Sequence, residues 1–152
     1  MTTITGIFHI NINCIDLERS KRFYELLGFR VAVEFPEGEY PDIGEGLAIG
    51  AHKVKGALMH RGENQDAAFL DLLEWIGADS NAQMTASAQT GGIRRIAFRA
   101  KDVSAEFERL RKEGVAFLSD PVTVSGPTGQ PGKFVCFLDP DGNMLELIEV
   151  QY

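Results

Sequence analysis

Hydrophobic and polar residues alternate along residues 8–14, as they do in a β-strand with one buried face. Apolar side chains then recur at helical spacing: Phe23, Leu26 and Leu27. Asp16 precedes this helical stretch and is a good N-cap, and Gly28 follows it and can take the left-handed conformation that ends a helix. The pattern predicts a strand and then a helix over residues 17–27.

The opening strand and its helix are repeated further along the chain. An offset of 86 residues places Gly114 at the position of Gly28 (114 − 28 = 86) and aligns the alternating residues around them. A second helix is therefore expected after an N-cap at Asp102 or Ser104 and before Gly114.

Short strand candidates follow each helix. Along the chain they are residues 29–34, 47–51, 69–75, 115–118, 133–138 and 144–150, with weaker candidates at 56–60 and 121–124. The last strands of the two copies align at an offset of 75, which places Glu146 at the position of Asp71 (146 − 71 = 75). Each copy predicts a β-α-β-β-β module.

The two copies predict the domain organisation. The first module is expected over residues 1–76 and the second over residues 93–152, and both belong to one domain over residues 1–152. Residues 77–92 between them are small and polar with almost no core-forming side chains, so we expect a linker there. A module of this size buries little surface by itself, which favours pairing of the two.

Composition and charge exclude several classes of function and partner. The chain carries 15 Lys and Arg against 22 Asp and Glu, a formal charge of −7, which disfavours a nucleic-acid partner. No apolar run approaches the roughly 20 residues of a membrane span, and no secretory signal opens the chain, so we expect a cytoplasmic protein with no membrane partner. Cys14 and Cys136 form no C-x-x-C motif and are predicted to be free, buried thiols.

Candidate chemistry lies on the polar face of the predicted strands. His9 and Asn11 point away from the apolar face of the first strand, because strand side chains alternate. Asp71 and Glu146 each stand between two leucines. A buried carboxylate normally has a cation, a metal or a hydrogen-bond donor nearby. His9, Asp71 and Glu146 are thus three candidate metal ligands.

Two motifs resemble those of a known family, the vicinal oxygen chelate superfamily, which includes glyoxalases, bleomycin-resistance proteins and extradiol dioxygenases. The first is His9-x-x-Ile12-x-Cys14-x-Asp16-Leu17-x-x-Ser20-x-x-Phe23-Tyr24-x-x-Leu27-Gly28-Phe29. The second is Phe137-x-Asp139-Pro140-Asp141-Gly142-Asn143-x-x-Glu146-Leu147. The resemblance implies an α+β fold in which two βαβββ modules pair into a curved mixed-sheet cup with helices on the outside. It also implies a homodimer.

The resemblance assigns a metal site to four positions, which here hold His9, Asp71, Arg95 and Glu146. Arg95 departs from the family pattern, since a guanidinium stays protonated and has no lone pair for a metal. Two alternatives remain open. Either the other three residues hold a divalent metal (Zn, Ni, Fe, Mn or Mg), with Arg95 supporting these ligands or binding a substrate carboxylate, or Arg95 replaces the metal and pairs with Asp71 and Glu146.

Two functions follow from these alternatives. The first is a glyoxalase-like lyase or isomerase that acts on a small molecule with adjacent oxygens, in which Glu146 or Asp71 moves a proton. The second is a metal-free protein that binds or sequesters a small molecule, as bleomycin-resistance proteins do, and the acidic charge would favour cationic ligands. In both, the expected ligand-binding residues are Arg95, Trp75, Phe69 and Asn11.

Overall fold

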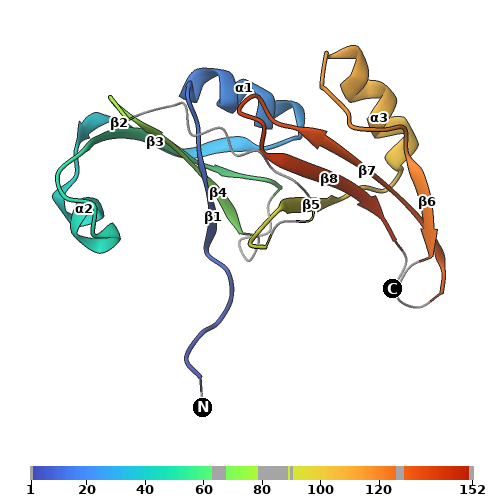
Figure 1. The fold of residues 1–152 in the computed structure, drawn as a ribbon, viewed down its shortest axis with the longest axis horizontal. Helices are drawn as coiled ribbons and strands as arrows, with labels where there is room; N and C mark the ends of the chain where they lie inside the picture. The colour runs from blue at the N-terminus through green and yellow to red at the C-terminus, as the bar shows by residue number, and fades with distance from the viewer. Residues whose placement is uncertain (1, 63–67, 79–88, 90, 126–128, 151–152) are drawn as a thin grey trace. The chain divides into compact units, whose positions relative to one another are not determined.

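The computed structural model describes residues 2–62, 68–78, 89, 91–125 and 129–150 (Figure 1). The chain divides into two compact units, residues 1–82 and 83–152. The described residues form one four-stranded mixed sheet in each unit and three helices in all. The predicted α+β class with two βαβββ modules is therefore confirmed. Most of the predicted linker, residues 77–92, lies outside the described residues.

Unit 1 contains a strand–helix–strand order followed by a short extra helix and two more strands. Its elements are β1 (His9–Asn13), α1 (Leu17–Leu26), β2 (Arg30–Glu39), α2 (Pro41–Leu47), β3 (Lys53–His60) and β4 (Phe69–Trp75). The sheet order is β1-β4-β3-β2, with β1 parallel to β4 and the other pairs antiparallel. The mixed sheet arises because the first strand pairs with the last.

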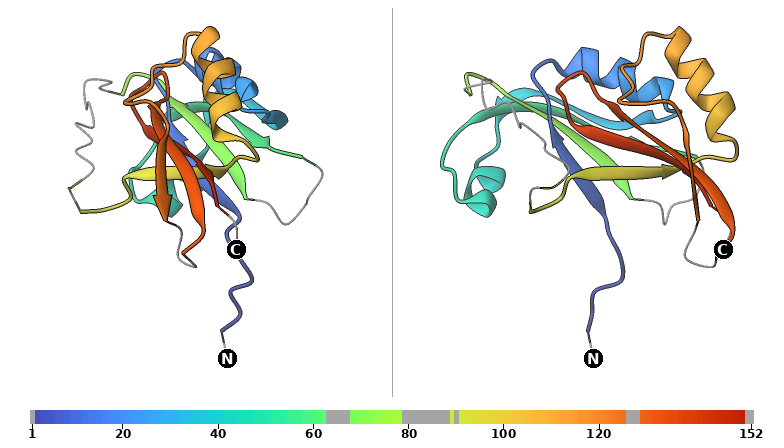
Figure 2. Two further views of the ribbon diagram at one scale, coloured as in Figure 1. Left: turned by 90° about the vertical axis from the view of Figure 1, so that its right-hand side faces the viewer. Right: turned by 45° about the vertical axis from the view of Figure 1, so that its right-hand side comes forward.

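Unit 2 repeats this topology without the extra helix. Its elements are β5 (Arg95–Arg99), α3 (Val103–Lys112), β6 (Val122–Ser125), β7 (Pro131–Leu138) and β8 (Met144–Glu149). The order is β5-β8-β7-β6, and again the first strand is parallel to the last. In each unit the helix packs against strands of its own sheet, α1 against β2, β3 and β4, and α3 against β7 and β8 (Figure 2).

The strand register reproduces both offsets found in the sequence. His9 lies opposite Phe69 in unit 1, and Arg95 lies opposite Met144 in unit 2. The first members differ by 86 residues (95 − 9) and the second by 75 (144 − 69). Positions related by these offsets are therefore structurally equivalent in the paired strands of the two units.

The two long helices begin and end as predicted. Asp16 accepts a hydrogen bond from the backbone N–H of Arg19, and Asp102 accepts one from the N–H of Ala105, each at 2.9 Å. The N-cap of α3 is thus Asp102 and not the alternative, Ser104. The glycines that follow the two helices, Gly28 and Gly114, have φ values of 86° and 85°, a conformation that glycine adopts without a steric penalty.

The predicted strand over residues 47–51 is wrong. Leu47 is the last residue of α2, and Ala48 then takes a left-handed conformation with φ of 57°. The helix starts at Pro41, whose fixed φ suits the first helical position. The third strand is instead β3 over Lys53–His60, where only a weak candidate was expected at residues 56–60.

The predicted strand over residues 115–118 is also wrong. Only Phe117 forms a bridge there, with Phe137 of β7, and the strand beside β7 is the weaker candidate, β6. Pro121 lacks an N–H for a sheet hydrogen bond, so the chain leaves β7 after Leu118 and rejoins it at Val122. This departure opens a depression beside α3 that is described below.

The buried cores are formed by the faces that the alternation identified. Among the fully buried side chains are Tyr24, Met59, Leu70 and Leu72 in unit 1 and Leu110, Val135, Phe137 and Leu145 in unit 2. Burial of such side chains is the main stabilising contribution to folding. Within the described residues, every helix is too short or too polar to cross a membrane.

Candidate functional site

Unit 1 presents polar side chains on the sheet face that points away from α1. On β1, Ile12 is buried at 6% exposure, whereas His9 and Asn11 are exposed, as the alternation predicted. Phe8 was expected on the buried face of this strand, but it precedes β1 and is 66% exposed. Asp71 on β4 lies directly opposite Asn11. The parallel pairing of β1 with β4 therefore brings a carboxylate between the two polar side chains of β1.

Asp71, Asn11 and His9 form one contact group. The Asn11 Nδ2 donates hydrogen bonds to the backbone oxygen of Asp71 at 3.1 Å and to its Oδ2 at 3.3 Å. The His9 Nε2 lies 3.8 Å from the same Oδ2. Burial raises the pKa of the Asp71 carboxyl, while the charge of His9 and the hydrogen bond from Asn11 oppose the rise. The group thus combines a basic carboxylate with two side chains that orient it.

Aromatic rings flank this group along β4. The Phe69 ring lies 5.5 Å from that of Phe8 and 5.7 Å from that of His60. Two residues that sequence reasoning did not assign to the site, Phe8 and His60, are thereby placed beside it. For His60 the signal was present in the β3–β4 alternation, since His60 follows Met59, which pairs with Leu70.

At the other end of β4, Trp75 is fixed by side chains from two neighbouring segments. Its Nε1 donates to Asn13 Oδ1 at 3.0 Å, and its ring meets that of His52 edge-on at 6.2 Å. Both His52 and His60 therefore contact aromatic rings. Phe69, Asp71 and Trp75 alternate with buried Leu70 and Leu72, so they share one face of the strand.

Unit 2 holds a different pair at the equivalent positions. Glu146 on β8 is buried, with 4% of its surface exposed, and its Oε2 forms an ion pair with the Arg95 Nε from β5. The Arg95 side chain is 49% exposed, so the guanidinium also reaches solvent. The expected contact of Arg95 with Glu146 is present, and it satisfies the charge of a carboxylate that would be costly to bury alone.

Cys136 on β7 completes the surroundings of Glu146. Its Sγ lies 3.9 Å from Oε2, and the two residues are opposite each other in the β7–β8 pair. Burial is the main cause that raises the pKa of the Cys136 thiol. The charge of Glu146 raises this pKa further, whereas the charge of Arg95 lowers it. Both cysteines are free, and Cys14 is buried as predicted, but Cys136 is only half-buried.

The expected metal ligands are distributed over both units. Unit 1 supplies His9 and Asp71, and unit 2 supplies Glu146, which is paired with Arg95. In the described part of the chain, no group of three or more His, Cys, Asp or Glu side chains is placed to hold a metal ion. Because Arg95 cannot ligate a metal, the donors around Glu146 are those of an ion pair and not of a metal centre.

Comparison with known proteins identifies the fold and one family. Residues 6–147 match the family model described as the Glyoxalase/Bleomycin resistance protein/Dioxygenase superfamily. The chain superimposes on the crystal structure of a glyoxalase family protein from Bacillus cereus with a TM-score of 0.80, at 18% identity, over 97% of this chain and 95% of that one. At this identity the superposition shows the fold alone.

Two relatives were found by sequence. The uncharacterised protein YwkD of Bacillus subtilis (strain 168) is 26% identical over 147 residues, which are 96% of this chain and 98% of YwkD. A 2-epi-5-epi-valiolone epimerase from an Actinomyces species is 34% identical over 82 residues, 53% of this chain and 44% of the epimerase. The match to the epimerase therefore spans about half of either protein.

Proposed function

Because the chain belongs to the Glyoxalase/Bleomycin resistance protein/Dioxygenase superfamily, we propose that it is a glyoxalase-like lyase or isomerase acting on a small molecule with two adjacent oxygens. The observation that carries the proposal is the Asp71 carboxylate, which lies on a polar sheet face with its pKa raised by burial. The similarity to an epimerase supports an isomerase in particular.

Asp71 is assigned the proton transfer. A carboxylate with a raised pKa is a stronger base than an ordinary one, and such groups take protons from carbon next to a carbonyl. Asn11 and His9 both contact Oδ2. Among the described residues none donates a hydrogen bond to Oδ1, so this oxygen is assigned to the substrate. The C–H proton moves to the carboxylate, the electron pair forms an enolate, and return of the proton completes the isomerisation.

Arg95 of unit 2 is assigned the binding of an anionic ligand group. Its Nε is used by Glu146, and its two terminal nitrogens make no hydrogen bond to a described residue. A guanidinium with free donors binds a carboxylate or an enolate oxygen well. Glu146, the other predicted proton carrier, is already held by Arg95, so we assign it the orientation of the guanidinium. Phe69 and Trp75 are assigned the apolar contacts to the ligand.

Members of this superfamily often depend on a metal, but the donor set described here does not fit a resident one. Unit 1 offers two donors, His9 and Asp71, and Glu146 is neutralised by Arg95. The proposed reaction therefore contains no metal-dependent step. Replacing the arginine tests this point: Arg95→His should bind Ni²⁺ or Zn²⁺ measurably more tightly than the unsubstituted protein in calorimetry, with Arg99→His as the matched control on β5.

Proton exchange in D₂O separates the roles most directly. With a panel of α-hydroxyketones and α-hydroxythioesters, after chelator treatment, the protein should exchange the α-proton, followed by proton NMR. Asp71→Asn should reduce the rate by about 100-fold or more. Asp42→Asn removes the same charge from an exposed position on α2 and should leave the rate unchanged. An Asp71→Asn variant as fast as the unsubstituted protein would contradict the assignment.

A second function is favoured by the ion pair of unit 2. Arg95 already balances the charge of Glu146, so no bound metal is needed to stabilise this buried carboxylate. The alternative is a metal-free protein that binds a small molecule, with cationic ligands favoured by the net charge of −7. Saturable binding by calorimetry without proton exchange would select this function over the enzyme.

The homodimer that the resemblance implies stays a prediction. The strands β1 and β2 are the two opposite edges of the unit 1 sheet, and exposed sheet edges are commonly covered by another chain. Light scattering coupled to size-exclusion chromatography should give a mass near twice 16.7 kDa.

A further inference from the structure

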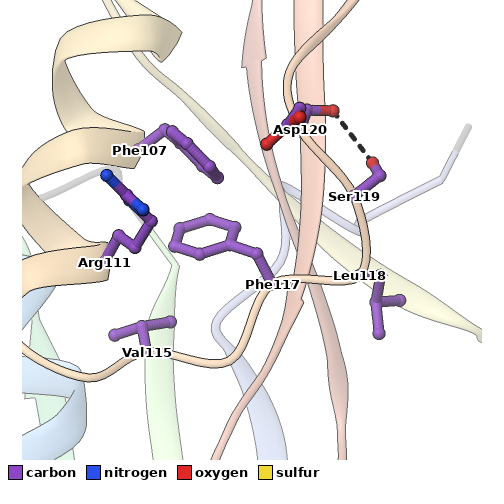
Figure 3. A pocket seen from close by; sticks show the side chains of 7 residues that line it. All are labelled: Phe107, Arg111, Val115, Phe117, Leu118, Ser119 and Asp120. Atoms are coloured by element: carbon purple, nitrogen blue, oxygen red, sulfur yellow. Dashed lines mark hydrogen bonds between the residues drawn. The ribbon is translucent and has the colours of Figure 1, made fainter.

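A depression lies beside α3 on the face of unit 2 that the helix covers (Figure 3). It is a shallow depression, largely open to solvent, with a volume of about 440 Å³. It is lined by Phe107, Arg111, Val115, Phe117, Leu118, Ser119 and Asp120. Glu146 lies elsewhere, because β8 residues that face the helix side, such as Leu145, alternate with it. The pocket is thus separate from the residues assigned above.

The floor of the pocket is aromatic and its ends are charged. The rings of Phe107 and Phe117 are 4.6 Å apart and meet edge-on. In Figure 3 they lie between Arg111 on the helix and Asp120 on the loop. The Arg111 guanidinium lies 5.9 Å from the centre of the Phe107 ring and donates to Glu108 at 2.9 Å. Its charge is therefore balanced by a neighbour on the same helix.

Unit 1 holds an ion pair between its helix α1 and the strand β2 that follows it. The helix offset of 86 relates Phe107 to Lys21, and the acidic residue after the helix is Glu34 of β2 in unit 1 and Asp120, outside the strands, in unit 2. In unit 1 the Lys21 Nζ lies 2.6 Å from Glu34 Oε1, and the Lys21 side chain is only 12% exposed. A lysine side chain thus crosses from helix to strand, with its methylene stem covered and its ammonium group on the carboxylate.

Unit 2 keeps the carboxylate and lacks the ammonium. Phe107 replaces the lysine, and among the described residues no cation forms an ion pair with Asp120. The Ser119 hydroxyl donates to the backbone oxygen of Asp120, not to its carboxylate, so the Asp120 side chain remains available. An acidic group beside two aromatic rings is a combination that attracts an organic cation.

We propose that this pocket binds a small primary ammonium compound with an aromatic or aliphatic stem. The ammonium group pairs with the Asp120 carboxylate, as the Lys21 ammonium pairs with Glu34 in unit 1, and the stem packs on Phe107 and Phe117. Because Asp120 is exposed, its ion pair contributes modestly, and contacts with the exposed parts of the two rings add to it, so the expected binding is weak.

Titration of the full chain with 2-phenylethylammonium chloride tests the proposal, followed by ¹H–¹⁵N NMR. Saturable shifts are expected in the amides of residues 107–111 and 117–120. Asp120→Asn should weaken binding by about three- to fivefold. Asp42→Asn, which removes the same charge from unit 1, should not change it. Phe117→Leu keeps an apolar side chain and should weaken binding by about threefold or more.

Two further compounds, one neutral and one negatively charged, test whether the charge of the amine matters. The neutral analogue 2-phenylethanol should bind about three- to fivefold more weakly than the amine, because it lacks the charge that Asp120 attracts. The anion phenylacetate should bind more weakly still. The proposal is overturned if Asp120→Asn binds as tightly as the unsubstituted protein, if phenylacetate binds as tightly as the amine, or if the shifts map to other residues.

Discussion

The carboxylate of Glu149, near the end of the chain, accepts a hydrogen bond at 2.9 Å from the backbone N–H of Val103, the first residue of α3. Unit 1 contains the same relationship, in which Glu74 accepts from the N–H of Leu17 at 2.8 Å. A carboxylate at this place satisfies one of the free N–H groups of the first turn and interacts favourably with the helix dipole. The last strand of each sheet thus holds the helix by its N-terminus.

Removing this contact should destabilise the protein. Glu149→Ala is expected to lower the free energy of unfolding by about 1 kcal/mol, the usual contribution of a helix-capping side chain. Glu74→Ala should cost more, because Glu74 also forms an ion pair with Lys55 at 3.0 Å. Urea denaturation measures both. Glu113→Ala, at the C-terminal end of α3, is the control and should have little effect, since an acid there gains nothing from the dipole.

The Arg95–Glu146 ion pair predicts that substitutions of its two residues have non-additive effects on the free energy of unfolding. Arg95→Met leaves a carboxylate that is 4% exposed without its cation, and it should lower the free energy of unfolding by about 1–2 kcal/mol, less than for a fully buried pair because Arg95 is half exposed. Glu146→Gln should restore most of this loss in the double variant. A double-mutant cycle in urea measures the coupling, and additive single effects would show that the pair contributes nothing.

The raised pKa of Asp71 predicts the sign of a pH dependence. The folded state holds the Asp71 proton to higher pH than the unfolded state does, so it binds more protons in that window. The stability of the protein relative to Asp71→Asn should therefore fall as pH rises through about 4 and above. Urea denaturation of both proteins over a pH series measures the difference.

NMR titration of the side-chain carboxyl carbons gives an independent measure. Asp71 should titrate at higher pH than Asp16, because the backbone N–H of Arg19 holds the pKa of Asp16 below its usual range. Asn11→Ala removes a hydrogen bond that lowers the pKa of Asp71, so that pKa should rise further in this variant. Titration of Asp71 below Asp16 would contradict the assigned environment.

Much of the fold could be predicted because it depends on local signals that occur twice. The caps at Asp16 and Asp102 and the glycines after both helices are visible in the sequence, and the offsets of 86 and 75 return in the strand register. The contact of Asn11 with Asp71 follows from the same reasoning, since alternation and register together place both on one face.

The errors have physical causes that local patterns do not carry. Leu47 and Ile49 resemble strand residues, yet they are 55% and 43% exposed at the end of α2. This helix contains two glycines and has no side-chain cap at Tyr40, so propensity disfavours it. Gly44 is required there because a Cβ would lie 2.2 Å from the Gly50 oxygen. Such a tertiary contact cannot be read from hydrophobic periodicity.

The site was predicted in part for the same reason. The faces of β1 and β4 follow from alternation, but the contact of Trp75 with Asn13 depends on how a large side chain reaches across to the next strand. The pocket beside α3 was missed, because it arises where the chain leaves β7 around Pro121, and no motif marks it.

The reactivity of Cys136 gives a final prediction that reports on the Arg95–Glu146 pair. Only the thiolate reacts with iodoacetamide, and burial and the Glu146 charge both raise the pKa of the Cys136 thiol. Glu146→Gln removes the nearby negative charge, lowers that pKa and should speed alkylation at neutral pH about twofold or more. Arg95→Met removes the nearby positive charge and should slow it.

Peptide mapping by mass spectrometry separates Cys136 from Cys14, which is buried and donates to the Leu73 backbone oxygen at 3.5 Å. Cys14 should therefore react slowly and at the same rate in all three proteins, which makes it an internal control for general loosening of the fold. Faster alkylation of both cysteines in Glu146→Gln would indicate local unfolding. Faster alkylation of Cys136 alone would show that its thiol senses the charge of Glu146 across the β7–β8 pair, with Arg95 opposing that charge.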